Sequence, residues 1–431
     1  METLLRALVL AVFAVSVTPA GAQDQRSDKH RLSLSIDLHA VSADTELESW
    51  PSGGLGKLRF DDSDGLTGSN RIALDYSGRL RPTLWGRVVA DYVDDASPGL
   101  DITEAYLTWR PVPKRPIHHQ LRFGAFYPPL SLENSGPAWS SPYTISFSAI
   151  NTWLGEEIRP IGLEWTLRRR IGGPTSASQF ATFASLFYGN DPAATMLFWR
   201  GWSLHDRQTR LNDKFDIPPL PSFDQNGNVT GLIPQTLEPI VEIDSRPGFY
   251  AGAEWTMNQR LKLQIAHYDN RAEPEAFRDG QWGWNTRFST LGFQASLPAE
   301  FGLIIQAMTG KTGWLAGARQ DGTIAGPGPL VTDHFDSAFV LLTRRLGHQH
   351  RLTARWDEFE ITRPGMNGPL DSDAGTGYTL AYRYDGMERF ALSFEWLRIQ
   401  SERALWSYLY ASPYSADEQQ LRAQVSLRLD L

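Results

Sequence analysis

The side chains best suited to chemistry are scattered along this sequence. It contains no Gly-x-Ser-x-Gly elbow, no His-Glu-x-x-His pair, no phosphate-binding Gly-rich loop and no cysteine. The acidic runs Asp61-Asp62-Ser63-Asp64-Gly65 and Asp224-Gln225-Asn226-Gly227-Asn228 have the residue types of calcium loops but lack the spaced glutamate. The histidines at 118–119 and at 348 and 350 have no acidic partner at ligand spacing. We therefore expect no catalytic residues, no metal and no cofactor, and polar turns at the acidic runs.

Ionisable residues recur in segments that alternate between apolar and polar positions, always on the polar face. Facing lipid, each Arg or Lys would cost about 2–4 kcal/mol at the membrane midplane. Such a density is equally unusual in a filled soluble core. We therefore expect these residues as a set to line a water-filled lumen, although any single one is better explained as an ordinary solvated wall residue. The candidate pore-lining residues are Asp75, Arg87, Asp91, Glu104, Arg122, Glu164, Arg355, Arg383, Arg422 and Arg428.

The elements that must position these side chains have a period of two, which is typical of strands. In 31–42, Leu32, Leu34 and Ile36 share one face while serine and aspartate take the other, and 421–431 repeats the pattern. Sixteen such segments are predicted. They cover 31–42, 70–80, 83–93, 101–110, 119–127, 157–169, 178–188, 247–258, 260–269, 286–297, 301–311, 335–345, 349–361, 376–385, 388–399 and 419–431.

Short and long connections take turns between these segments. Tight links such as 258–259 and 386–387 separate long ones such as 43–69 and 189–246. An outer-membrane barrel has short periplasmic turns and long outer loops, whereas a soluble sandwich has no reason for this order. The sequence therefore predicts an all-β fold, a 16-stranded antiparallel transmembrane outer-membrane β-barrel with both ends on the periplasmic side.

Aromatic residues lie where a membrane interface would place them. Trp109, Trp165 and Trp255 come shortly before predicted periplasmic connections, while Tyr92 and Tyr127 end strands that run outward. Girdles of aromatic side chains at both interfaces produce this distribution. The high strand propensity of aromatic residues is the alternative explanation, but it accounts for their number and not for their position.

Composition agrees with an exported membrane barrel. The 431 residues carry a net charge of -8, which argues against a nucleic-acid partner, and the mean hydropathy of -0.33 excludes a bundle of membrane helices. Residues 1–22 are predicted to be a signal peptide, with an apolar run at 7–15 and an Ala-Gly-Ala cleavage site. We expect 23–30 to be a short periplasmic segment, 31–431 to form the barrel, and the protein to reside in the outer membrane of a Gram-negative cell.

The third long connection, 128–156, is the predicted functional loop. It is too rich in aromatic residues to extend into solvent, so we expect it to fold into the lumen. Its candidate constriction residues are Glu133, Asn134, Glu156 and Glu157, whose carboxylates would face the Arg-bearing strands across the channel. Packing against a neighbouring subunit is the alternative for this loop. The fourth connection, 189–246, is long enough to act as a lid or plug.

The passage from strand five into this loop resembles a known family. Arg122-Phe123-Gly124-Ala125-Phe126-Tyr127-Pro128-Pro129-Leu130-Ser131-Leu132-Glu133-Asn134, followed by Gly155 and Ile161-Gly162, is similar to phosphate-selective porins of the O and P type. The resemblance implies a 16-stranded trimeric porin whose third loop enters the lumen. Two departures stand out: the loop has no Lys or Arg ladder, and the chain ends in Leu431 where porins usually end in an aromatic residue.

These features together predict a passive, water-filled channel for small hydrophilic and charged solutes, with no catalysed reaction. The expected partners are outer-membrane lipid and lipopolysaccharide, the barrel assembly machinery, and two further copies in a homotrimer. The arginine wall favours anions, whereas the acidic loop favours cations. The alternatives are a plugged structural or adhesive barrel and an outer-membrane barrel hydrolase, although His39, His205, His267 and His334 have no evident serine partner.

Overall fold

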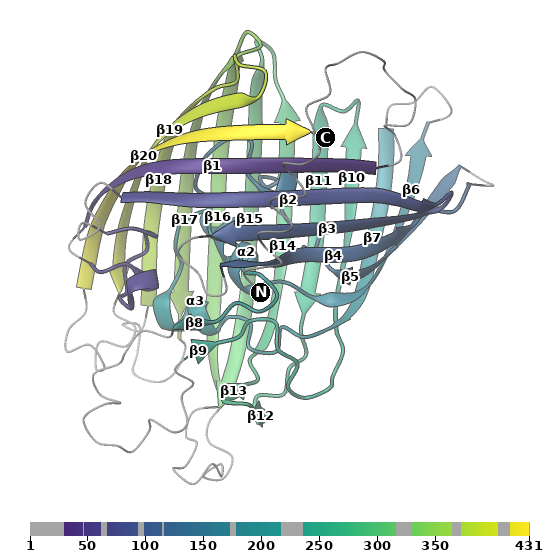
Figure 1. The fold of residues 1–431 in the computed structure, drawn as a ribbon. Coiled ribbons are helices and arrows are strands. Elements are labelled where there is room, and N and C mark those ends of the chain that lie inside the picture. The colour runs from purple at the N-terminus through teal and green to yellow at the C-terminus, as the bar shows by residue number, and fades with distance from the viewer. Residues whose placement is uncertain are drawn as a thin grey trace, which may run out of the picture.

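The computed structural model describes residues 30–45, 47–61, 67–93, 99–113, 116–172, 178–216, 236–315, 330–363, 372–403 and 414–430. Sixteen strands form a closed barrel in which each strand is antiparallel to its neighbours, and β20 closes the ring against β1 (Figure 1). The predicted fold class is confirmed. The predicted signal peptide at 1–22 lies outside the described residues, as do residues 23–29 of the segment expected to follow it.

Every predicted strand is present in the barrel. Closure pairs each backbone N–H and C=O with a neighbouring strand and leaves no sheet edge, as a bilayer requires. The barrel strands are β1 (His30–Asp44), β2 (Thr67–Arg81), β3 (Leu84–Val93), β4 (Leu100–Trp109), β5 (Ile117–Ala125), β6 (Ile161–Ile171), β7 (Ser178–Tyr188), β10 (Gly248–Met257), β11 (Leu261–Asp269), β14 (Asn285–Ser296), β15 (Phe301–Leu315), β16 (Leu330–Leu346), β17 (His350–Thr362), β18 (Ser372–Tyr384), β19 (Phe390–Arg403) and β20 (Tyr414–Asp430).

The predicted start of strand six at residue 157 is wrong. Helix α2 (Ala149–Glu157) occupies that stretch, because the side chain of Ser148 caps it by accepting a hydrogen bond from the Asn151 backbone N–H. Pro160 cannot donate to a ladder, so β6 begins only at Ile161.

The long connections contain further short elements. Helix α3 (Thr195–Arg200) lies in the fourth, together with the small hairpin of β8 (Phe215–Asp216) and β9 (Thr236–Leu237). The fifth connection, which joins β11 to β14, contains β12 (Phe277–Arg278) and β13 (Gln281–Trp282). No helix in the described residues is long and apolar enough to cross a membrane.

The outer surface of the barrel is apolar. On β6 the exposed side chains are Ile161, Leu163 and Trp165, while the alternate positions face inward and are buried. Trp109 on β4 and Trp165 on β6 both pair in register with Leu121, so the two indoles belong to the same row across the sheet. An apolar outer face with a row of tryptophans is typical of a barrel in contact with lipid.

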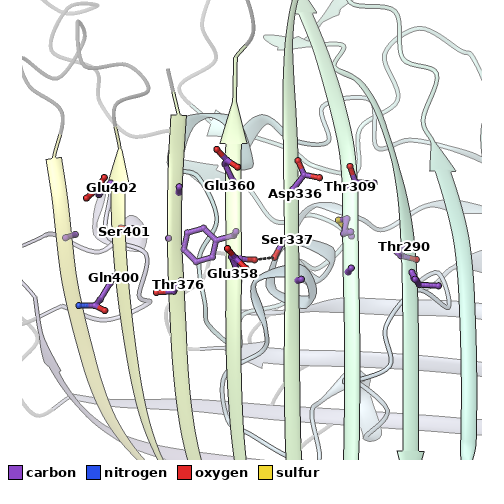
Figure 2. Close-up of a pocket in the computed structure, with 18 of the residues that line it drawn as sticks. Thr290, Thr309, Asp336, Ser337, Glu358, Glu360, Thr376, Gln400, Ser401 and Glu402 are labelled. Carbon is purple, nitrogen blue, oxygen red and sulfur yellow. Dashed lines mark hydrogen bonds between the residues drawn. The ribbon is translucent and has the colours of Figure 1, made fainter. Parts of the chain in front are cut away.

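Strands β16–β20 extend beyond this apolar belt at the end that carries the long connections. Glu358 and Glu360 share the outward face of β17 with Trp356, and Asp336 lies opposite Glu360 on β16. Figure 2 shows these carboxylates with Glu402 near the ends of the strands, where they line a shallow hollow of the outer wall. Because carboxylates are unfavourable in hydrocarbon, we infer that this part of the wall lies outside the hydrocarbon core of the membrane, on the side of the long connections.

Candidate functional site

The third long connection folds into the lumen. Pro128 and Pro129 follow β5 and cannot donate to a strand ladder, so the chain leaves the wall there. Figure 1 shows α2 within the barrel, and all 9 of its residues are buried. A short helix that is buried on every side cannot show an amphipathic pattern, which explains why the sequence did not predict it.

The fourth connection packs against the third. The indole of Trp153 on α2 makes edge-on contacts with Trp202 of the fourth connection, Phe335 of β16 and Phe288 of β14, with ring centroids 5.1–6.0 Å apart. Trp50 and Leu58 of the first connection belong to the same buried cluster. Among the described residues, the middle of the lumen is therefore filled by a loop core, whereas the sequence predicted water there. The reason is that inserted loops can fill a space that wall side chains alone cannot span.

A buried arginine of the wall holds this loop core in place. Arg355 of β17 donates to Glu133 (2.8 Å), to the carbonyl oxygens of Ser146 (2.8 Å) and Phe147 (2.9 Å), and to Asp357 (2.7 Å). The Arg355 and Glu133 side chains are both 0% exposed. Arg355, predicted to line the pore, therefore faces inward, but it serves as an anchor for the third connection.

Two wall carboxylates complete this anchor. Asp357 accepts a hydrogen bond from the Ala149 backbone N–H at the start of α2 (3.0 Å). Glu395 of β19 accepts from the backbone N–H groups of Ile145 (2.7 Å) and Ser146 (3.0 Å). Charge-assisted hydrogen bonds of this kind are stronger than neutral ones.

The other candidate constriction residues are also buried. Glu156 forms an ion pair with Arg200 (2.6 Å), and the Nε2 atom of His205 lies 2.9 Å from its Oε1. Burial alone would raise the pKa of Glu156, but these two neighbours lower it well below its ordinary value. Asn134 donates to the Trp139 carbonyl oxygen (3.1 Å) within the loop.

Glu157 has a different environment. It accepts from the Trp153 indole (2.8 Å) and from the backbone N–H groups of Met196 and Leu197 at α3 (both 3.1 Å). Burial raises its pKa to about 7, and the adjacent Glu156 adds to the rise. None of Glu133, Asn134, Glu156 and Glu157 is thus presented to water in this conformation, since their exposed fractions are 0%, 6%, 1% and 0%.

The remaining candidate pore-lining residues all lie on the inner face of the wall. Most are paired across neighbouring strands: Arg87 with Asp75 (2.7 Å) and Arg122 with Glu164 (3.0 Å). Asp91 pairs with Arg71 (2.8 Å), and Glu104 accepts from the Tyr127 backbone N–H (3.1 Å). Arg422 pairs with Asp206 of the fourth connection (2.9 Å), and Arg383 pairs with Asp385 (2.8 Å).

Two adjoining cavities, of about 510 and 290 Å³, lie between the tip of the third connection and the wall. Arg428 and Pro137 line both of them. The linings include the start of β1 and the end of β20, so this basic recess lies toward the short-turn end of the lumen. Seven arginines and four carboxylates line it, and two further carboxylates lie behind this lining: Asp91 pairs with Arg71 (2.8 Å), and Glu104 lies 3.8 Å from Arg87. The arginines are Arg31, Arg71, Arg87, Arg110, Arg383, Arg389 and Arg428, and the carboxylates are Asp37, Asp75, Asp385 and Glu388.

Sequence reasoning missed part of this recess. Arg31 and Arg71 occupy inward positions of predicted strands, so the period of two could have identified them. Arg110 and Arg389 fall inside the predicted strands 101–110 and 388–399, although each lies one residue outside the observed strand. The period places Arg389 on the inward face, and it could have placed Arg110 there too. No period could identify Asp206, which lies in the fourth connection and joins the wall arginine Arg422 to Arg59 of the first connection (2.9 and 3.1 Å).

One expectation about histidines is wrong. His267 of β11 has a serine partner, since its Nδ1 lies 2.9 Å from the Ser289 hydroxyl on β14. Both side chains are on the outward face of the wall. In the described part of the chain no carboxylate or amide orients the other ring nitrogen of His267, so the pair lacks the third member of a hydrolase triad.

Comparison with known proteins agrees with the fold. No protein-family model and no curated protein matches the sequence. Among solved structures, the outer membrane channel DcaP of Acinetobacter baumannii has a TM-score of 0.51 at 10% identity, with 95% of this chain and 100% of that chain covered. An anion-selective porin from Comamonas acidovorans (TM-score 0.48, 11% identity, 93% and 99% covered) and OmpT, an outer membrane protein of Vibrio cholerae (0.48, 9%, 95% and 100%), are also similar.

The barrel and its apolar outer face, together with this likeness in fold, show that the chain has the fold of a 16-stranded β-barrel of the bacterial outer membrane.

Proposed function

We propose that this protein is a passive outer-membrane channel that prefers small anionic solutes. The observation that carries the proposal is the basic recess, where seven arginines outnumber the four carboxylates of the lining and still outnumber them when Asp91 and Glu104 are added. The acidic third loop had favoured cations, but Glu133 and Glu156 are buried and paired with arginines, so they do not oppose the recess. A surplus of wall arginines raises the local concentration of anions and disfavours cations.

The loop core limits passage through the barrel. We propose that solutes pass where this core meets the wall of β1–β4 and β20, and that fluctuations of the loops set the conductance. The packing of Trp153 and Trp202 in mid-lumen supports a second candidate, a plugged structural barrel. Swelling of proteoliposomes in small sugars and organic acids separates the two, because a plugged barrel would give none.

The decisive experiment measures reversal potential in a planar bilayer under a salt gradient, with the refolded chain from residue 23. Each arginine that lies about 8 Å from a permeating anion attracts it by about 0.5 kcal/mol in a water-like dielectric. Removing two of them would therefore weaken the binding of the anion by ~1 kcal/mol or more. Arg31→Gln with Arg428→Gln should therefore lower the anion-to-cation permeability ratio at least about fivefold, since the same change favours cations. Arg344→Gln on the exposed outer wall is the matched control and should leave it unchanged. Cation selectivity of the unmodified channel would refute the proposal.

A catalysed reaction is not part of the proposal. The pair of Ser289 and His267 is the feature that would favour a hydrolase. However, the backbone N–H groups of β11 and β14 beside this pair form the hydrogen bonds of the sheet, so they are not available to stabilise an oxyanion. A serine-reactive fluorophosphonate that labelled Ser289 would overturn this view.

Several finer points rest on the sequence. We propose that residues 1–22 are removed on export and that the assembly machinery inserts the chain as a homotrimer in contact with lipopolysaccharide. Likeness to the phosphate-selective O and P type also remains a proposal, and the absence of a basic ladder on the third loop argues for broader anion selectivity.

A further inference from the structure

Three carboxylates from the two ends of the fourth connection meet near the C-terminal end of β7. Asp191 lies just after β7, while Glu242 and Asp244 lie shortly before β10. Each of the three offers an oxygen, and these oxygens all lie within 4.8 Å of one another. Residues some 50 positions apart in the sequence are thus brought together by the fold, which is why no local motif marked them.

Backbone hydrogen bonds hold the three carboxylates in position. The Asp191 Oδ2 accepts from the Ile243 N–H (2.5 Å), and Glu242 accepts from the N–H groups of Gly189 and Ser245 (both 2.6 Å). Asp244 accepts from the Glu273 N–H (2.5 Å), which ties the fifth connection to the cluster. The geometry is therefore set by main-chain contacts and not by the carboxylates themselves, whose charges repel.

The charges of this cluster are not compensated. In the described residues, none of Asp191, Glu242 and Asp244 forms an ion pair, and the nearby Arg246 is paired with Glu273. Asp191 is only 1% exposed, yet its Oδ1 has no hydrogen-bond partner within the described chain. An unpaired carboxylate oxygen in a buried position costs free energy unless a cation or a proton compensates it.

The donor set indicates which cation would fit. All of the ligands are oxygens, which suit calcium, magnesium and manganese rather than zinc or copper. Calcium binds oxygen at about 2.4 Å, so the oxygens around one ion lie no more than about 4.8 Å apart, and the three carboxylates satisfy this limit. Magnesium requires shorter bonds of about 2.0–2.1 Å and strict octahedral geometry. Glu242 and Asp244 are half-buried and leave room for the water ligands that would complete a calcium shell.

We propose that Asp191, Glu242 and Asp244 form a calcium site that clamps together the two ends of the fourth connection. This connection contains α3, Trp202 and Asp206, all of which help to fill the lumen. Bound calcium would therefore stabilise the loop core. The long connections face the outside of the cell, where millimolar calcium is sufficient for a site with a Kd of about 10⁻⁴–10⁻³ M.

The test is calorimetric titration of calcium chloride into the chelator-treated, refolded barrel in detergent free of lipopolysaccharide, whose phosphates would themselves bind calcium. We expect one site in the unmodified chain and at least a tenfold weaker Kd in Asp191→Asn. Glu242→Gln, a change at a less buried position, should weaken binding in the same way if Asp191→Asn fails to fold. Asp279→Asn, at an exposed carboxylate of the fifth connection, is the matched control and should bind as the unmodified chain does.

A second readout is limited trypsin digestion after Lys214 of the fourth connection, whose side chain is 58% exposed and which is followed by Phe215. Calcium should slow this cleavage in the unmodified chain and not in Glu242→Gln. Absence of binding to a correctly folded barrel would overturn the site, and equal affinity for magnesium would overturn its assignment to calcium. Equal loss in Asp279→Asn would show that binding occurs elsewhere. These results do not depend on ion selectivity, so the site and the proposed channel function can fail separately.

Discussion

Replacing Arg355 by methionine is expected to release the third connection from the barrel wall. The substitution removes the ion pairs with Glu133 and Asp357 and the donors to the carbonyl oxygens of Ser146 and Phe147. Methionine nearly preserves the apolar volume but leaves two buried carboxylates without their cation. Breaking a buried ion pair in this way costs about 3–5 kcal/mol. Each 1.4 kcal/mol is a factor of ten, so the population with the loop displaced should rise by roughly two to four orders of magnitude.

Two measurements report that population. The chain has no cysteine, so a single Ala149→Cys at the start of α2, a position that is 0% exposed, reacts with a maleimide only when the loop leaves its place. In the Arg355→Met background, labelling should accelerate by the factor above, and single channels should spend more time in a high-conductance state. The barrel itself should remain intact by heat-modifiable migration on gels, because every strand ladder is preserved.

Two further variants test whether the buried charge of Arg355 anchors the loop. Arg383→Met removes a partly exposed pair with Asp385, whose side chains are 30% and 43% exposed, and should change labelling little because such pairs contribute about 0–1 kcal/mol. Adding Glu133→Gln to Arg355→Met should recover part of the loss, because it removes one of the stranded charges. Equal labelling rates in Arg355→Met and Arg383→Met would contradict the anchoring role of Arg355.

The remaining predictions concern pH and a second anchor. Because burial raises the pKa of Glu157 from its ordinary 4.5 to about 7, the packed loop binds more protons than the released loop. Its stability should then decline as pH rises from about 4.5 to 7. The rate of Ala149→Cys labelling, divided by the rate of a free thiol at the same pH because maleimide reacts with the thiolate, should be higher at pH 8 than at pH 5. Glu157→Gln should abolish that difference in the normalised rate, and an unchanged pH dependence would contradict the assignment. Lys57 of the first connection pairs with Asp373 of β18 (3.0 Å), and both side chains are almost fully buried. Lys57→Met should lower the unfolding temperature, whereas adding Asp373→Leu should restore most of it; a double variant no more stable than Lys57→Met would argue against this ion pair.

Much of the fold could be predicted because its signals are local. Every barrel strand follows from a period of two, since successive side chains on a strand face opposite sides and lipid tolerates only apolar ones. The same period identified the inward positions of Asp75, Arg87 and Arg422, and it would have identified Arg71. It failed at the start of β6, where a proline and the Ser148 cap override the pattern.

What the side chains of the lumen do was decided by the tertiary structure alone. Glu133 and Arg355 are 222 positions apart, and no period along the chain indicates that one neutralises the other. The same is true of Asp191 with Glu242 and Asp244, and of Trp153 with Trp202. Loop contacts of this kind depend on where the barrel wall places its charges and on which space remains to be filled. The sequence by itself thus determined the barrel and the side of the wall that each residue faces. The three-dimensional packing determined that the acidic third loop is neutralised, that the lumen is filled, and that arginines dominate the recess that is left.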